Sequence, residues 1–127
     1  MADREFLIRL PWPSKDLSPN ARVHWTKRSA AAKKARRDAC YIAQGAGCRA
    51  LGCDRLTVEI TCHPPDARAR DTDNMLASIK SGLDGIADAS GVDDSQWNYG
   101  IASGEPVKGG AVLVHVTTSE KNEKART

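Results

Sequence analysis

The stretch RLTVEITCHPPDARARDTDNMLASIKSGLDGIADASG, residues 55–91, combines a strand pattern, a polar loop and a helix pattern. In residues 55–63 apolar and polar side chains alternate, as in a strand that buries one face, and two prolines then end the strand. In residues 74–89 apolar side chains recur every three or four positions, which predicts an amphipathic helix that Gly91 terminates. The chain therefore passes from a strand to a helix through a loop of charged residues.

The segments on either side complete the pattern. We predict a strand at residues 5–10, a helix from about Ser29 to Gly45, and two final strands at about 97–103 and 111–117. The order β-α-β-α-β-β indicates an α/β (α+β) fold, with one mixed β-sheet and two main helices packed against it. The buried stripes of the two helices are expected at Ala32, Ala35, Ala39 and Ile42, and at Leu76, Ile79, Leu83 and Ile86.

Length and composition narrow the class of protein. With 127 residues, the chain is expected to form a single domain, residues 1–127, with a charged, disordered tail at residues 118–127. No apolar run approaches the roughly 20 residues of a membrane span, and the N-terminus is too polar for a signal peptide. We therefore expect a cytoplasmic protein whose four cysteines are free thiols, because none of them form a C-x-x-C pair.

Basic side chains are concentrated in one segment. No acidic residue occurs between Ser18 and Arg37. Such a run is either a solvated helix face or a surface that binds an anion, and the lack of balancing glutamates favours a polyanion such as nucleic acid. The residues predicted to bind DNA are Lys27, Arg28, Lys33, Lys34, Arg36 and Arg37, together with Arg68 in the loop before the second helix.

Two aspartates, Asp71 and Asp73, stand two positions apart at the start of the second helix. In extended backbone, side chains at positions i and i+2 point to the same side, so the two carboxylates can converge. Helix capping would explain Asp73, but it would not explain Asp71 or the later pair Asp93–Asp94. Grouped carboxylates are the hard oxygen ligands that Mg²⁺ and Mn²⁺ prefer, so the sequence suggests a metal site.

The pair Asp93–Asp94 lies beyond the other end of the same helix. A helix of about 16 residues would place it roughly 24 Å from Asp73. To join Asp71 and Asp73, the chain must fold back after the helix, or a different subunit must supply the third carboxylate. The sequence leaves both arrangements open.

Four segments of the chain are similar, in order and in spacing, to those of a known family. They are LPWPSKDLSPN (10–20), CHPPDARARDTDN (62–74), GLDGIADASGVDDSQW (82–97) and PVKGGAVLVHV (106–116). Together they resemble the RusA family of Holliday junction resolvases of bacteria and their phages. The likeness extends roughly from Leu7 to Val116, and its most specific part is R-D-x-D-N followed by a helix and V-D-D.

The resemblance implies a homodimeric endodeoxyribonuclease that cuts four-way (Holliday) DNA junctions in recombination and repair, by Mg²⁺-dependent phosphodiester hydrolysis. It implies that Asp71, Asp73 and Asp94 are the catalytic carboxylates that bind one or two metal ions, with Mn²⁺ as a possible substitute. It also assigns a catalytic role to Arg70, which we expect to stabilise the charge that grows on the phosphoryl oxygens. A two-fold dimer would place two sites symmetrically, as paired cuts across a junction require.

One position departs from the family pattern. The best-known members carry a catalytic lysine four residues after the second aspartate, where this chain has Ala77. Lys80 follows one turn later, and seven residues at about 100° each return within about 20° of the direction of Asp73. Lys80 is therefore expected to share a helix edge with Asp73 and to replace the family lysine. The alternative is a surface lysine that extends along the edge of the core.

Two other functions are compatible with these features. One is a protein that binds branched DNA and has weak or lost nuclease activity, because the family lysine is replaced by Ala77. The other is a nuclease for other branched DNA, such as flaps or replication forks. A purely structural role would leave the three acids and the basic run unexplained.

Overall fold

A computed structural model of the chain describes residues 4–119. Its strands (β), α-helices (α) and short 3-10 helices (η) are β1 Glu5–Pro11, η1 Lys15–Leu17, α1 Trp25–Gly45, β2 Arg55–His63, α2 Thr72–Ser90, η2 Asp94–Gln96, β3 Trp97–Ser103 and β4 Ala111–Ser119. Apart from the two short 3-10 helices, this order confirms the predicted β-α-β-α-β-β succession.

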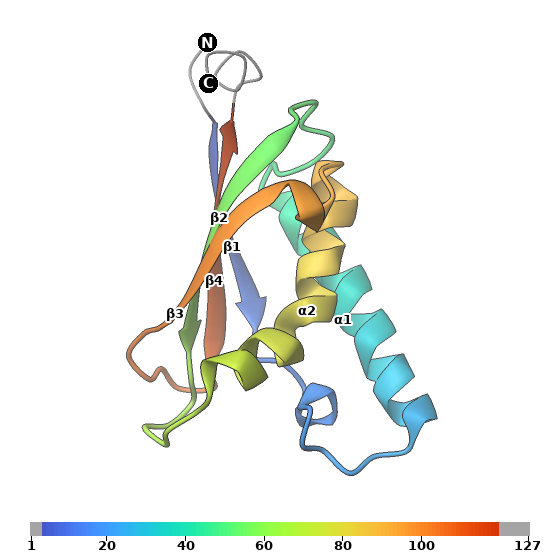
Figure 1. Cartoon of the computed structure of the whole chain (residues 1–127), viewed down its shortest axis with the longest axis vertical. Coiled ribbons are helices and arrows are strands. Elements are labelled where there is room, and N and C mark those ends of the chain that lie inside the picture. Colours follow the sequence, from blue (N-terminus) through green and yellow to red (C-terminus); the bar gives the residue numbers. More distant parts are fainter. Residues whose placement is uncertain (1–3, 120–127) are drawn as a thin grey trace.

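The four strands form one mixed sheet with the order β1-β4-β2-β3 (Figure 1). Strand β4 pairs antiparallel with both β1 and β2, whereas β3 runs parallel to β2. Parallel neighbours need a crossover connection, which α2 supplies between β2 and β3. The charged loop before α2 therefore lies just beyond the carboxyl end of β2, where the sheets of α/β proteins commonly bind ligands.

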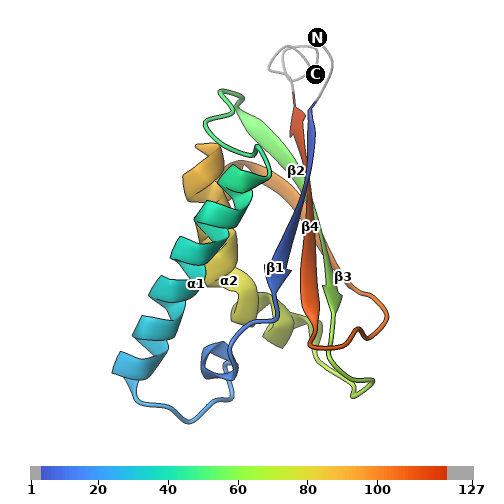
Figure 2. The ribbon, with the colours of Figure 1, turned by 180° about the vertical axis from the view of Figure 1, so that it is seen from behind.

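Both helices cover the same face of the sheet, as the two opposite views show (Figures 1 and 2). The buried side chains of β2 and β4 largely alternate with less buried ones, and they include Leu56, Val58, Ile60, Cys62, Val112, Val114 and Val116. On the other face of the sheet, Leu7 and Glu59 are exposed. The alternation predicted for residues 55–63 is thus confirmed.

The helix stripes agree with the prediction in part. In α2, Ile79, Leu83 and Ile86 are buried as predicted, and Leu76 is half-buried. In α1, Ala39 is buried as predicted, whereas Ala32, Ala35 and Ile42 are half-buried. Ala43, which lies outside the predicted stripe, is also buried.

Helix α1 begins at Trp25, earlier than the predicted start near Ser29. His24 acts as its N-cap, because Nδ1 of the ring accepts a hydrogen bond of 3.2 Å from the backbone N–H of Thr26. Histidine is not among the preferred capping residues, which are Ser, Thr, Asp and Asn. For this reason the sequence pattern did not reveal the first turn of the helix.

The two helices approach closely at Gly85 of α2. A Cβ atom at this position would lie 2.2 Å from the carbonyl oxygen of Arg36 and 2.9 Å from the amide nitrogen of Cys40, both in the backbone of α1. Backbone atoms of a packed helix cannot move aside as the end of a flexible side chain can. Gly85 therefore sets the distance between the helices and fixes α2, with its charged residues, on the sheet.

Strand β4 extends to Ser119, beyond the predicted end at residue 117. Thr118 is buried, pairs with Leu56 of β2, and accepts a hydrogen bond of 2.9 Å at Oγ1 from the backbone N–H of Arg4. The prediction of a disordered tail is therefore wrong for Thr118 and Ser119, while residues 120–127 lie outside the described residues. Neither α-helix within residues 4–119 combines the length and the apolar character that a membrane crossing requires.

Candidate metal and DNA site

The loop between β2 and α2 places Asp71 and Asp73 together at the N-terminal end of α2. The helix begins at Thr72, so Asp71 is its N-cap, whereas the sequence suggested Asp73 for that role. Oδ1 of Asp71 accepts a hydrogen bond of 2.8 Å from the backbone N–H of Asp73. Both side chains are exposed, and the positive end of the helix dipole attracts negative charge to this position.

Capping uses one carboxylate oxygen of Asp71. Within residues 4–119 no hydrogen bond or ion pair engages the carboxylate of Asp73, which leaves both of its oxygens for a ligand. Carboxylate oxygens are the donors that Mg²⁺ and Mn²⁺ prefer, so the chemistry of the pair fits a divalent cation. Helix capping alone does not account for Asp73, because Asp71 performs it.

Arg70, directly before Asp71, is held by contacts within the loop. Its Nη1 lies 3.0 Å from Oδ1 of Asp66 and donates to the carbonyl oxygen of Arg68 at 3.0 Å. Its Cζ lies 5.5 Å from the ring centroid of Trp12. The hydrogen bond from Arg70 holds the pKa of Asp66 below its usual range. Arg70 therefore braces the loop. The side chain of Arg68 is 76% exposed, with its Nη2 3.7 Å from Oδ2 of Asp66.

Trp12 connects this loop to the sheet. A Cβ atom at Gly110 would lie 2.9 Å from the ring and the Cβ of Trp12, and the φ angle of Gly110 is 72°, which favours glycine. Trp12 is thus in close contact with Gly110, just before β4, and the guanidinium group of Arg70 lies over its ring. Its structural role is to support the residue that precedes Asp71.

A groove of about 460 Å³ lies beside Asp71, between the segment that contains η1 and the loop before α2. Its polar lining includes Lys15, Asn20, Arg68 and Asn74. Donors of this kind bind phosphate and sugar groups of nucleic acids. A larger groove, of about 600 Å³, lies between η1 and α1, but it is mainly apolar and contains none of the predicted metal ligands.

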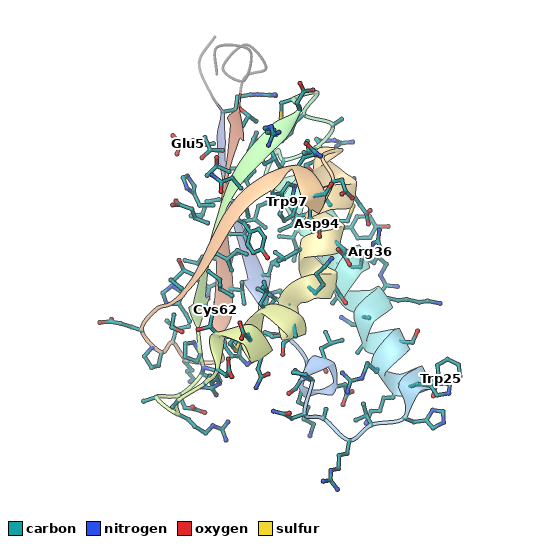
Figure 3. The ribbon with its side chains drawn as sticks, in the orientation of Figure 1. Glu5, Trp25, Arg36, Cys62, Asp94 and Trp97 are labelled. Atoms are coloured by element: carbon teal, nitrogen blue, oxygen red, sulfur yellow. The ribbon has the colours of Figure 1, made fainter. Side chains whose placement is uncertain are left out.

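Asp93 and Asp94 follow α2, at the start of η2. Figure 3 labels Asp94, which lies beside α2. Asp93 caps η2, since its Oδ2 accepts a 3.0 Å hydrogen bond from the backbone N–H of Ser95, and hydrogen bonds from Ser95 lower the pKa of Asp93. Asp94 is bonded to Lys80 instead, with Nζ 2.9 Å from Oδ2. Lys80 also donates to Asp84. The hydrogen bond to Asp84, and to a smaller extent that to Asp94, raises the pKa of Lys80.

The three predicted metal ligands therefore lie at two separate places along α2. Asp84, which shares Lys80 with Asp94, follows Asp73 by about three helical turns, or about 16 Å along the axis. Accordingly, the described part of one chain contains no group of three His, Cys, Asp or Glu side chains that could hold a metal ion. The chain does fold back after α2, but one subunit does not bring Asp94 to Asp71 and Asp73.

Lys80 lies near Asp94 rather than near Asp73. Its predicted helix edge faces solvent, but its side chain extends to Asp84, one turn further along the helix. Sequence reasoning missed Asp84 as a partner. The signal was present in the spacing, because residues at i and i+4 are neighbours on a helix surface.

Most of the basic run of α1 already has partners in the structure. The ion pairs are Lys27–Asp16, Lys34–Asp38, Arg36–Asp88 and Arg37–Asp38, with nitrogen–oxygen distances of 4.0, 2.7, 2.7 and 3.6 Å. Arg28 donates to two carbonyl groups of the preceding loop, and Lys33 is exposed. Exposed pairs of this kind contribute little to stability, so these side chains can exchange their partners for phosphates. The charge pattern of the run did not reveal these acids, because Asp16 and Asp38 lie outside the run and Asp88 lies on the other helix.

The four cysteines, Cys40, Cys48, Cys53 and Cys62, are free, as predicted. Burial raises the pKa of the Cys48 thiol to about 11, the direction expected for an inert, packed side chain.

Comparison with known proteins identifies a relative in a bacterium. The chain is 46% identical over 114 residues to an uncharacterized protein of Xylella fastidiosa (strain Temecula1), and the match covers 87% of this chain and 74% of that protein. No family model matches the chain.

Proposed function

This chain belongs to the same family as the Xylella fastidiosa protein, and we propose that it is a Mg²⁺-dependent endodeoxyribonuclease of the RusA type. In this proposal a homodimer cuts branched DNA, above all four-way junctions, by phosphodiester hydrolysis in the cytoplasm of a bacterium or a phage-infected cell. The observation that carries the proposal is the exposed pair Asp71 and Asp73, at the N-terminal end of α2 and beside a polar groove.

If two subunits met through the exposed face of α2, about a two-fold axis perpendicular to this helix, the set of carboxylates would be complete. Two α2 helices related by such an axis run antiparallel, so the N-terminal end of each lies beside the C-terminal half of the other. Asp71 and Asp73 of one subunit would then meet Asp94 of the partner subunit. Ala77 and Ser81, which lie between the two places, are small and allow two helices to approach closely.

In such a shared site, the carboxylates of Asp71, Asp73 and Asp94 would hold Mg²⁺ or Mn²⁺. A bound divalent ion supplies the Lewis acid that activates water and stabilises charge on phosphate oxygens. Because Lys80 is bonded to Asp94, the lysine of one subunit would accompany its acid to the other subunit's metal ligands. There its ammonium group can donate to the phosphoryl oxygens as charge develops on them.

DNA backbones would follow the basic side chains that border this site. Lys15 and Arg68 line the groove next to Asp71, and Lys33 is exposed on α1. Contacts between such cations and phosphates position the substrate and release counterions, so binding should weaken steeply as salt rises. Arg70 contributes by keeping the loop of Arg68 in place.

The proposal is tested with the purified wild-type protein and labelled DNA substrates. We expect Mg²⁺-dependent cleavage of a four-way junction at a rate at least about tenfold above that of a linear duplex, and no cleavage in EDTA. Flap and fork substrates are compared under the same conditions, with Mn²⁺ as a second cation.

The other possible results of this experiment would indicate a different function. Tight binding of the junction without cleavage in Mg²⁺ or Mn²⁺ would indicate a branched-DNA-binding protein without nuclease activity. Faster cleavage of flaps or forks than of junctions would indicate a nuclease for other branched DNA. A protein that neither binds nor cuts branched DNA would contradict the proposal as a whole.

A further inference from the structure

The ammonium group of Lys80 is shared between two carboxylates. Nζ lies 2.9 Å from Oδ2 of Asp94 and is also bonded to Oδ1 of Asp84. Because one nitrogen serves both acids, the acceptor oxygens lie on the order of 5 Å apart. Figure 3 shows Asp94 beside α2, where it contacts Lys80.

The two acids differ in how firmly they are tied to the lysine. Asp84 lies one turn after Lys80 on α2, so the helix itself fixes this pair. Asp94 belongs to η2, a separate element that follows the helix. If one of the two contacts is exchanged for another partner, it is therefore the contact with Asp94.

We propose that Asp84 is a positioning residue of the carboxylate site, to which Lys80 withdraws when a divalent cation binds Asp94. This inference rests on the proposed function, because it requires that Asp94 binds a cation. In the free subunit, Lys80 occupies the place of the counter-cation on Asp94. Asp84 keeps the displaced ammonium group paired, and it holds that group about one hydrogen-bond length from the site, where it can meet a phosphate.

The reason is electrostatic. An ammonium group and a divalent cation on the same carboxylate repel each other, so the lysine must move or the cation binds weakly. With Asp84 present, the movement costs little, because Lys80 keeps one of its two partners. Of the two carboxylates that Lys80 contacts in the structure, only Asp94 would remain without Asp84. The lysine would then compete with the metal for Asp94.

The competition can be measured by Mn²⁺ binding to the purified dimer in isothermal titration calorimetry, without DNA and without a cleavage assay. We expect Asp84→Asn to raise the Kd for Mn²⁺ about tenfold, a coupling of the size found between contacting groups. We expect Lys80→Met to lower the Kd, because the competing cation is gone. In the double variant, Asp84→Asn should have little further effect, since Asp84 acts through Lys80.

The control is Asp88→Asn, which removes a carboxylate one turn further along the same helix. Asp88 is paired with Arg36 and does not contact Lys80, so the Kd for Mn²⁺ should equal that of the wild type. Melting curves for all variants establish that they are folded, as expected for substitutions on an exposed helix face.

Three results would overturn the inference. If Asp84→Asn binds Mn²⁺ as the wild type does, Asp84 has no role in the site. If Asp84→Asn weakens binding equally with and without Lys80, Asp84 acts only through its own charge. If the wild type binds no Mn²⁺, the proposed function fails together with the inference, whereas the first two results leave the proposed function intact.

Discussion

Replacing Asp73 with Asn is expected to lower Mg²⁺-dependent cleavage of a four-way junction by about a thousandfold, the upper range for loss of one group that stabilises charge in an active site. Asp73 is the better target of the first two acids, because Asp71 also caps α2 and its loss would disturb the helix. The loss of charge at the start of the helix costs only about 0.3–1 kcal/mol of stability, so the variant should fold. Junction binding should persist or improve, since a negative charge next to the DNA is removed.

The matched control for this substitution is again Asp88→Asn. It removes the same charge from the same helix, at an exposed position paired with Arg36. We expect it to cut the junction at the wild-type rate in a single-turnover assay. Cleavage by Asp73→Asn at the wild-type rate would show that Asp73 is not part of the catalytic site.

Replacing Gly85 with Ala is expected to destabilise the protein by about 3 kcal/mol, although alanine is the better helix former by about 1 kcal/mol. The added methyl group would lie 2.2 Å from the carbonyl oxygen of Arg36 and 2.9 Å from the Cβ of Ala39. The helices must separate to admit it, and the core between them loses contacts. Thermal or urea unfolding followed by circular dichroism measures the effect, with a fall in Tm on the order of 10 °C.

Gly45→Ala provides the comparison for this prediction. Gly45 is the last residue of α1, and a Cβ atom there would meet nothing within 4 Å. This variant should be as stable as the wild type or slightly more stable, because only the helix propensity changes. If Gly85→Ala were equally well tolerated, α1 and α2 would not pack as closely as they do in the structure.

The fold was largely predictable from local patterns. Alternation along β2 identified a strand with one buried face, and Gly91, with φ of 79°, marked the end of α2 as predicted. The first turn of α1 was not predictable, because its cap is a ring nitrogen of His24. The extension of β4 to Thr118 depends on pairing with β2, which no local pattern reveals.

The candidate site was predictable only where its residues are close in sequence. Asp71 and Asp73 lie together because they share one loop and the first turn of one helix. The contact of Lys80 with Asp94, unlike its i+4 contact with Asp84, depends on how the chain turns back after α2. The pairing of the basic run with Asp88 likewise depends on the contact between two helices. Contacts of this kind follow from tertiary packing, which sequence spacing does not specify.

The central claim is that the two halves of the site, Asp71 with Asp73 and Asp94 with Lys80, come from different subunits. Nicking of a four-way junction by a mixed dimer tests it most directly, with Asp73→Asn in one subunit and Asp94→Asn in the other. If the sites are shared between subunits, both substitutions of a mixed dimer fall into one of its two sites, and the other site is intact. Random pairing should therefore restore about a quarter of the wild-type nicking rate, although each variant alone is inactive. A mixture as inactive as either variant alone would contradict the account.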